Sequence, residues 1–226
     1  MRVKTDKRRQ EILQAAGEVF RTEGYADASM SKISLRLGGS KATLYGYFPS
    51  KEELFVAVMH EMSRRHAVPQ ADELERDIDS EKGLARLVQS VMRASSSRET
   101  LDFRRMLIAE SGRTNVGKIA YEHGTKHFLQ RISDRYAENM KEGRLREADP
   151  WQAAMHLFSL CMGPPVQLVL EGVIDPLSED ELAAASRSAA AVFLRAYALP
   201  PPQEHTGKKM SQQRRPKRRL AGSRPV

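Results

Sequence analysis

The sequence predicts an all-α chain, and three observations support this fold class. Apolar residues recur at steps of three and four along most of the 226 residues, which is the spacing of a buried helix face. No stretch alternates β-branched residues over the length of a strand. Ser, Asp and Pro residues stand where helices are expected to begin. Since 40% of the residues are hydrophobic, the chain can bury a core.

The first fifty residues predict one long helix followed by two short ones. The long helix covers residues 7–22 and ends at Gly24, because glycine favours the C-cap of a helix. The short helices cover residues 30–37 and 41–47. Gly38 lies between them and can adopt the positive φ that a tight turn requires.

A capping box of Ser50 and Glu53 predicts a fourth helix that runs to about residue 65. The later predicted helices cover residues 81–96, 99–111, 116–141, 150–171 and 179–198. Pro164 lies inside the fourth of these with Gly and Pro beside it, so we expect a kink or a break there. Asp149 and Ser178 are expected to cap the last two helices.

Charge is distributed unevenly along the chain. Residues 1–51 carry a net charge of +5, residues 52–199 carry −4 and residues 200–226 carry +7, within a total of +8. Basic ends around an acidic body are expected where only the ends contact a polyanion. The tail has almost no apolar residues, which predicts disorder. The tail would either add nonspecific DNA affinity or serve only as a solubilising appendage. Elsewhere in the chain, the polar stretch over 70–79 predicts a connection between helices.

Several function classes are disfavoured by what the sequence lacks. Cys161 is the one cysteine, so no disulfide framework or multi-cysteine metal site is expected, and a reducing cytoplasmic location is predicted. The sequence contains no run of about 18 apolar residues, so no membrane span is predicted. His60 begins a partial zinc signature, but position 64 is Arg, and the pair His123 and His127 lacks a clear third ligand. We therefore expect no metal, no cofactor and no enzymatic activity.

The three N-terminal helices predict a helix-turn-helix, in which the second short helix lies in the DNA major groove. Apolar residues from all three are spaced to meet in one core, namely Ile12, Ala16, Phe20, Ile33, Leu37, Leu44 and Phe48. This packing leaves Lys41, Ala42, Thr43, Tyr45 and Tyr47 on or near the outer side of the second short helix. Such groups bind phosphates, base edges or thymine methyl groups.

Residues 12–54, ILQAAGEVFRTEGYADASMSKISLRLGGSKATLYGYFPSKEEL, closely resemble the DNA-binding domain of the TetR family of bacterial regulators. Gly39 departs from the family pattern, which usually has a β-branched or other apolar residue there. The resemblance implies that operator DNA is contacted by Ser31, Lys41, Thr43, Tyr45, Tyr47 and Lys51, with the last two mainly on phosphates. The alternatives are that the two tyrosines pack in the fold and that Lys51 is a solvated residue at a helix start.

The rest of the chain bears a weaker likeness to one branch of that family, through residues 103–111 and 143–150. This likeness implies a ligand pocket in the helical body and a dimer built from the last two helices. The pocket candidates are Met62, Phe103, Met106, Glu110, Phe128 and Met162, with Tyr121 or His123 as a further polar group, and plain core packing is the alternative for the apolar ones. The dimer candidates are Leu157, Leu160, Leu168, Val192, Phe193 and Tyr197.

These observations together predict three regions: a helix-turn-helix DNA-binding domain over 1–50, a helical ligand-binding and dimerisation domain over 51–199, and a disordered basic tail over 200–226. The expected function is a ligand-responsive transcriptional regulator, by family habit a repressor. It would bind a palindromic operator in double-stranded DNA as a homodimer and respond to an unidentified small-molecule effector. The alternative is a nonspecific or architectural DNA-binding protein dominated by its tail, and an enzyme of unknown type is a third possibility.

Overall fold

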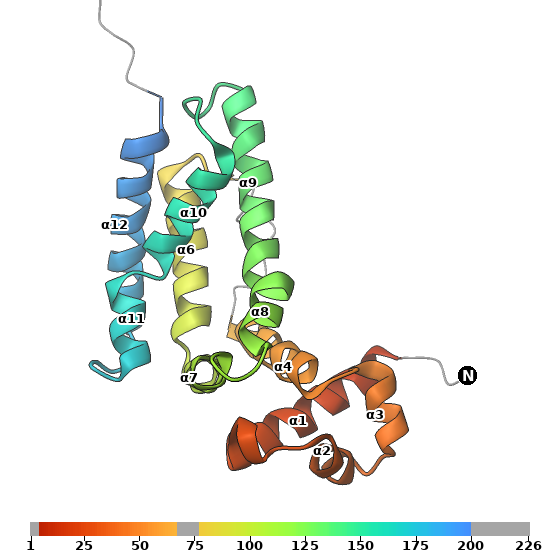
Figure 1. Ribbon diagram of the computed structural model, residues 1–226. Helices are drawn as coiled ribbons and strands as arrows, with labels where there is room; N and C mark the ends of the chain where they lie inside the picture. Colours follow the sequence, from red (N-terminus) through yellow and green to blue (C-terminus); the bar gives the residue numbers. More distant parts are fainter. Residues whose placement is uncertain (1–4, 67–76, 200–226) are drawn as a thin grey trace, which may run out of the picture.

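The computed structural model describes residues 5–66 and 77–199, and the regular elements in this part of the chain are helices, which confirms the predicted all-α class (Figure 1). The β pairing there amounts to one isolated antiparallel bridge between Leu145 and Ala198. The predictions for the basic tail and for most of the connection over 70–79 lie outside the described residues.

The N-terminal helices begin and end where their caps place them. They are α1 (Asp6–Asp27), α2 (Met30–Leu37), α3 (Lys41–Tyr47) and α4 (Lys51–His66). The hydroxyl oxygen of Ser29 accepts the backbone N–H of Lys32, and that of Ser40 accepts the backbone N–H of Thr43. Gly24 interrupts α1 with a φ of 76°, so the regular part of this helix ends there as predicted.

The remaining described residues form the helical body. Its elements are α6 (Glu81–Ser96), α7 (Arg98–Ser111), α8 (Val116–Ala120), the π-helical turn η2 (Tyr121–Thr125), α9 (Lys126–Lys141), α10 (Pro150–Cys161), α11 (Pro164–Glu171) and α12 (Glu179–Tyr197). The helix predicted over 116–141 is thus one helical path with a π-helical turn inside it. The helix predicted over 150–171 breaks at Gly163, since the ring of Pro164 prevents the helix from continuing.

One hydrophobic core joins the N-terminal helices to the body. Phe20 of α1, Leu44 of α3, Phe55 of α4 and Phe103 of α7 are all buried in it. The ring centroid of Phe55 lies 5.1 Å from that of Phe20 and 5.5 Å from that of Phe103. Figure 1 shows α4 between the helix-turn-helix and the upright helices of the body. The predicted boundary between residues 50 and 51 therefore falls inside a continuous core.

A second core fills the body between α6, α9, α10 and α12. Tyr136, Phe193 and Tyr197 stack there, with ring centroids 5.0 Å and 4.6 Å apart along the row. Cys161 is fully buried beside them, and burial raises the pKa of its thiol to about 12. This cysteine is therefore a core residue.

Among the described residues, no single helix is long and apolar enough to cross a membrane. The pair α10 and α11 passes that test jointly, but it is bent by 50° at the break. Apolar side chains of this pair, including Leu157 and Val166, are buried in the second core.

Candidate nucleic-acid interface and body cavity

The turn between α2 and α3 is held by backbone and side-chain hydrogen bonds. Gly38 has a φ of 65°, and its N–H donates to the carbonyl oxygen of Leu35. The Gly39 N–H donates to the Ser34 carbonyl, and the Ser34 hydroxyl donates back to the Gly39 carbonyl over 3.0 Å. These bonds fix α3 relative to α2.

Gly39, the departure from the family pattern, lies against the first turn of α1. A Cβ at this position would lie 2.7 Å from Nη2 of Arg8, whose Nη1 is paired with Glu11 at 2.7 Å. The absence of a side chain at Gly39 therefore lets the Arg8 guanidinium pack over the turn.

Three of the six predicted DNA contacts are exposed side chains. Lys41 and Tyr45 project from α3, Ser31 projects from α2, and Tyr45 is 49% exposed. Thr43 is half-buried, and its hydroxyl lies 2.9 Å from that of Ser40. Sequence reasoning did not single out Leu35, which is 83% exposed four residues after Ser31 on α2. An exposed leucine at this place offers apolar contact to a thymine methyl group.

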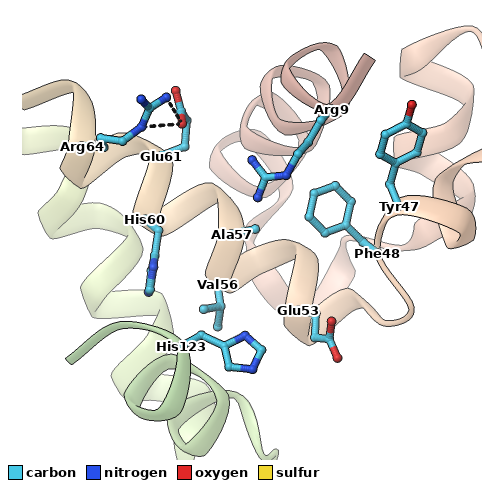
Figure 2. Close-up of a pocket in the computed structure, with 10 residues that line it drawn as sticks. All are labelled: Arg9, Tyr47, Phe48, Glu53, Val56, Ala57, His60, Glu61, Arg64 and His123. Carbon is cyan, nitrogen blue, oxygen red and sulfur yellow. Dashed lines mark hydrogen bonds and ion pairs between the residues drawn. The ribbon is translucent and has the colours of Figure 1, made fainter. Parts of the chain in front are cut away.

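Tyr47 is half-buried, and its hydroxyl oxygen accepts the Thr5 backbone N–H at 2.9 Å. Figure 2 shows its ring next to Phe48, over which the Arg9 guanidinium lies at 5.5 Å from the ring centroid. Tyr47 therefore fastens the start of α1 to the end of α3. Its predicted contact with phosphate stays a prediction.

Lys51 has a structural role that the sequence did not predict. Its ammonium donates hydrogen bonds to the carbonyl oxygens of Tyr25 at 2.9 Å and Ala28 at 3.1 Å, and it lies 4.2 Å from the centroid of the Tyr25 ring. These carbonyls stand at the end of α1, where helix geometry leaves them without partners. Two of the three N–H donors of the ammonium thus serve the fold, and the predicted contact of Lys51 with phosphate stays a prediction.

Two cavities flank α4. The first, of about 440 Å³, lies between α4 and the start of α1 and is shown in Figure 2. Its lining residues are largely polar: Arg9, Tyr47, Phe48, Glu53, Val56, Ala57, His60, Glu61, Arg64 and His123. The Arg64 guanidinium pairs with the Glu61 carboxylate at 2.8 Å. This first cavity separates the helix-turn-helix from the body on one side of α4.

The second cavity, of about 480 Å³, lies between α4 and the helices of the body, opens to solvent beside Ile108 and Tyr121, and is mostly apolar. It is lined by Met59, His60, Val91, Ser95, Thr100, Arg104, Leu107, Ile108, Gly117, Ala120, Tyr121, Gly124, Thr125, Phe128, Phe158 and Met162. Of the predicted pocket residues, Phe128 and Met162 line this cavity, as does Tyr121. Met62 and Phe103 are instead buried in the first core and Met106 packs against it. Glu110 is not among the lining residues either, so this cavity does not support the four, and their contacts with a ligand stay predictions.

His60 lines both cavities, and its ring faces η2. A Cβ on Gly124 would lie 2.5 Å from the His60 ring, so the two helices touch through this glycine. Burial lowers the pKa of His60 below its ordinary value, and the neighbouring His123 and His127 lower it further. Across residues 5–66 and 77–199, no group of three or more His, Cys, Asp or Glu side chains is placed to hold a metal ion.

The predicted dimer surface divides into buried and accessible residues. Leu157, Phe193 and Tyr197 are buried within the second core of this chain. They are corrected from dimer contacts to core residues, because they are buried in the core between the helices of their own chain. Val192 is 49% exposed, while Leu160 and Leu168 are partly exposed.

Both the N-terminal helices and the body match known protein families. Residues 12–58 match the family described as bacterial regulatory proteins, tetR family. Residues 82–199, more than half of the chain, match the C-terminal domain of AefR-like transcriptional repressors.

Individual relatives agree with these matches. The transcriptional repressor AcnR of Corynebacterium jeikeium is 24% identical over 176 residues, which cover 76% of this chain and 82% of AcnR. The crystal structure of a TetR-family regulator from Mesorhizobium loti has a TM-score of 0.70 and 26% identity, and covers 88% of this chain and all of its own. The flavonoid-responsive regulator FrrA has a TM-score of 0.67 and 27% identity, over 87% of this chain and 100% of FrrA.

These relatives are transcriptional regulators and not enzymes, as the sequence analysis predicted for this chain. The helix-turn-helix match and the body match together span both hydrophobic cores. The chain therefore belongs to the TetR family of transcriptional regulators.

Proposed function

We propose that this regulator is a repressor that binds a palindromic operator as a homodimer and releases it when a small molecule occupies the body cavity. The observation that carries the proposal is the position of α4. Leu54, Phe55 and Val58 of this helix pack in the core of the helix-turn-helix, whereas Met59 and His60 line the cavity. One rigid helix therefore touches both the DNA-binding unit and the space for a ligand.

The response would be a shift between two populations. A ligand changes operator affinity only to the extent that it binds one conformation better than the other. Two recognition helices read a palindrome when they are about 34–36 Å apart, one turn of DNA. A ligand that favours another position of α4 would move α3 away from this spacing. FrrA, whose fold is similar and which is described as flavonoid-responsive, supports a small-molecule effector.

The homodimer would use the outer faces of α10 and α12. Val192 presents apolar surface there and is 49% exposed, and Leu160, which packs against the second core, is still partly exposed on α10. Two-fold symmetry in the protein matches two-fold symmetry in the operator. A regulator of chromosomal genes acts on DNA in the cytoplasm, which fits the location that we propose.

The experiment is selection of bound fragments from random-sequence DNA with the full-length protein, followed by affinity measurements on the selected site. We expect a palindrome with half-sites one helical turn apart. Lys41→Ala should weaken operator binding by about 1–3 kcal/mol if it removes a base contact. Lys82→Ala is the matched control, since it removes the same charge from the exposed start of α6. Selection of unrelated fragments, or equal binding by the two variants, would argue for nonspecific DNA binding.

A further inference from the structure

The body cavity contains one strongly polar feature, the guanidinium of Arg104. Among the described residues that line the cavity, Arg104 alone carries a permanent charge, and none is an Asp or a Glu. Apart from His60, its surroundings are apolar or hydroxyl-bearing, with Leu107, Phe128 and Phe158 on the walls and Thr100 one helical turn before Arg104 on α7.

Arg104 has few partners inside the described chain. Its Nη1 donates one hydrogen bond to the Ser95 carbonyl oxygen at 3.2 Å. A guanidinium has five N–H donors, so most of its capacity is unused there. Burial lowers the pKa of Arg104, and no ion pair of Arg104 is found in the described part of the chain. Arg104 is partly buried, and a charge that is partly removed from water without a counter-charge is less favourable in the folded protein.

The next residue, Arg105, has the contacts expected of an arginine that stabilises the fold. Arg105 donates to the carbonyl oxygens of Leu170 at 2.9 Å and Val169 at 3.1 Å, and it pairs with Asp102 at 3.4 Å. These bonds tie α7 to the end of α11. Arg104 has no comparable set of hydrogen bonds among the described residues. It nevertheless lines the cavity and is the more buried of the two arginines.

We propose that the body cavity binds an organic anion with an apolar body, whose carboxylate is held by the guanidinium of Arg104. The planar guanidinium matches a carboxylate with two parallel hydrogen bonds. The apolar part of the ligand would lie against Leu107, Phe128, Phe158 and Met162. The cavity volume of about 480 Å³ lies in the usual range for small-molecule sites. This inference rests on the proposed function in one respect, that the cavity is the effector site.

The test is calorimetric titration of the full-length protein with two pairs of probes. Octanoate and octanamide form a linear pair, and 2-naphthoate and 2-naphthamide form an aromatic pair; within each pair the shape is kept and the charge is removed. Charge-assisted hydrogen bonds predict that at least one carboxylate binds about tenfold or more tightly than its own amide.

Arg104→Met removes the cation and keeps an apolar side chain of similar length. This variant should bind the carboxylates about 10- to 100-fold more weakly and the amides as well as before. Arg104→Lys should recover part of the carboxylate affinity, because it restores charge without the planar fork. Arg86→Met is the matched control, since Arg86 is exposed on α6 and does not line the cavity.

A measurement without ligand separates a binding residue from a structural one. If Arg104 is kept for a ligand, Arg104→Met removes a partly buried charge that has no ion pair among the described residues, and the Tm should stay level or rise by about 2–4 °C. A fall in Tm combined with the absence of any selective carboxylate binding would overturn the inference. Equal affinity for carboxylate and amide in the wild-type protein would overturn it as well.

Operator release, measured with the same probes, separates this inference from the proposed function. If the amides bind and release the operator as well as the carboxylates do, the cavity is an effector site and the anion inference falls. If carboxylates bind through Arg104 but operator affinity does not change, the anion site stands and the proposed effector response falls.

Discussion

Replacing Lys51 by Met tests whether this lysine stabilises the fold or contacts DNA. Its ammonium donates to two carbonyl oxygens at 2.9 Å and 3.1 Å and lies 4.2 Å from the Tyr25 ring centroid. Hydrogen bonds of a charged group contribute about 1.5–3 kcal/mol each, and an accessible cation–π contact contributes about 0.5–1 kcal/mol. Because Lys51 is half-buried and water can replace part of these contacts, we expect Lys51→Met to lower the free energy of unfolding by about 2 kcal/mol.

The assay is urea unfolding of the full-length protein followed by circular dichroism. Lys41→Met is the matched control, because Lys41 is exposed at the start of α3 and the same charge is removed. Its free energy of unfolding should stay within about 0.5 kcal/mol of the wild-type value. Its operator affinity should fall, whereas Lys51→Met should retain the affinity of its folded fraction.

A phosphate contact at Lys51 would give the opposite pattern. The slope of log K against log salt would become shallower by about 0.9, since one phosphate fewer is neutralised. The free energy of unfolding would not change. That combination would refute the structural role of Lys51.

Three further predictions concern the turn, the dimer surface and the histidine between the cavities. Gly38→Ala should lower the free energy of unfolding by about 1–2 kcal/mol, because its φ of 65° is unfavourable for a residue with a Cβ. Gly39→Ala displaces only the end of the Arg8 side chain and should cost less than about 1 kcal/mol. Equal losses of the two variants in urea unfolding would contradict this. Val192→Asp should leave the fold intact and weaken self-association in sedimentation. Phe193→Ala should lower the free energy of unfolding by about 3–5 kcal/mol, because Phe193 is buried. A Phe193→Ala variant that is stable but monomeric would instead show that Phe193 is a dimer contact. His60 has a lowered pKa in the folded state, so the unfolded chain binds more protons and stability should fall as the pH drops below the ordinary value near 6.5. Thermal unfolding of His60→Gln between pH 7.5 and 5.5 should show a weaker pH dependence than the wild type, and an unchanged dependence would assign it to other groups.

Local signals account for the parts of the fold that the sequence predicted well. The start of α3 is set by Ser40, the turn before it by Gly38, and the start of α12 by Ser178 with Glu181. Each signal acts within a few residues, so no knowledge of distant neighbours is needed. The break at Pro164 is local in the same sense.

Side-chain roles that depend on distant neighbours were predicted less well. Lys51 reaches carbonyls more than twenty residues earlier, and only the folded path of α1 brings them within its range. Phe193 and Val192 are adjacent on α12, and deciding which faces the core requires knowing that Tyr136 stacks on Phe193.

The sequence around Arg104 differs from that around Arg105 in its acidic residues. The residues three and four positions away from it are Thr100, Leu101, Leu107 and Ile108, and none of these is acidic. Arg105, in contrast, has Asp102 three positions before it. A cation in an apolar stretch without an acid at helical spacing is a candidate for a partner from outside the chain.

The π-helical turn η2 has a consequence for how the cavity wall is built. In an α-helix each N–H bonds to the carbonyl four residues earlier, but here the Lys126 N–H reaches the carbonyl of Tyr121, five residues earlier. The segment therefore contains one residue more than a plain helix needs, equivalent to a single-residue insertion. Gly124, which lies against the His60 ring, is one of the residues of this turn. A chain shortened by one residue at η2 would keep α8 and α9 as one straight helix and would enclose a differently shaped cavity.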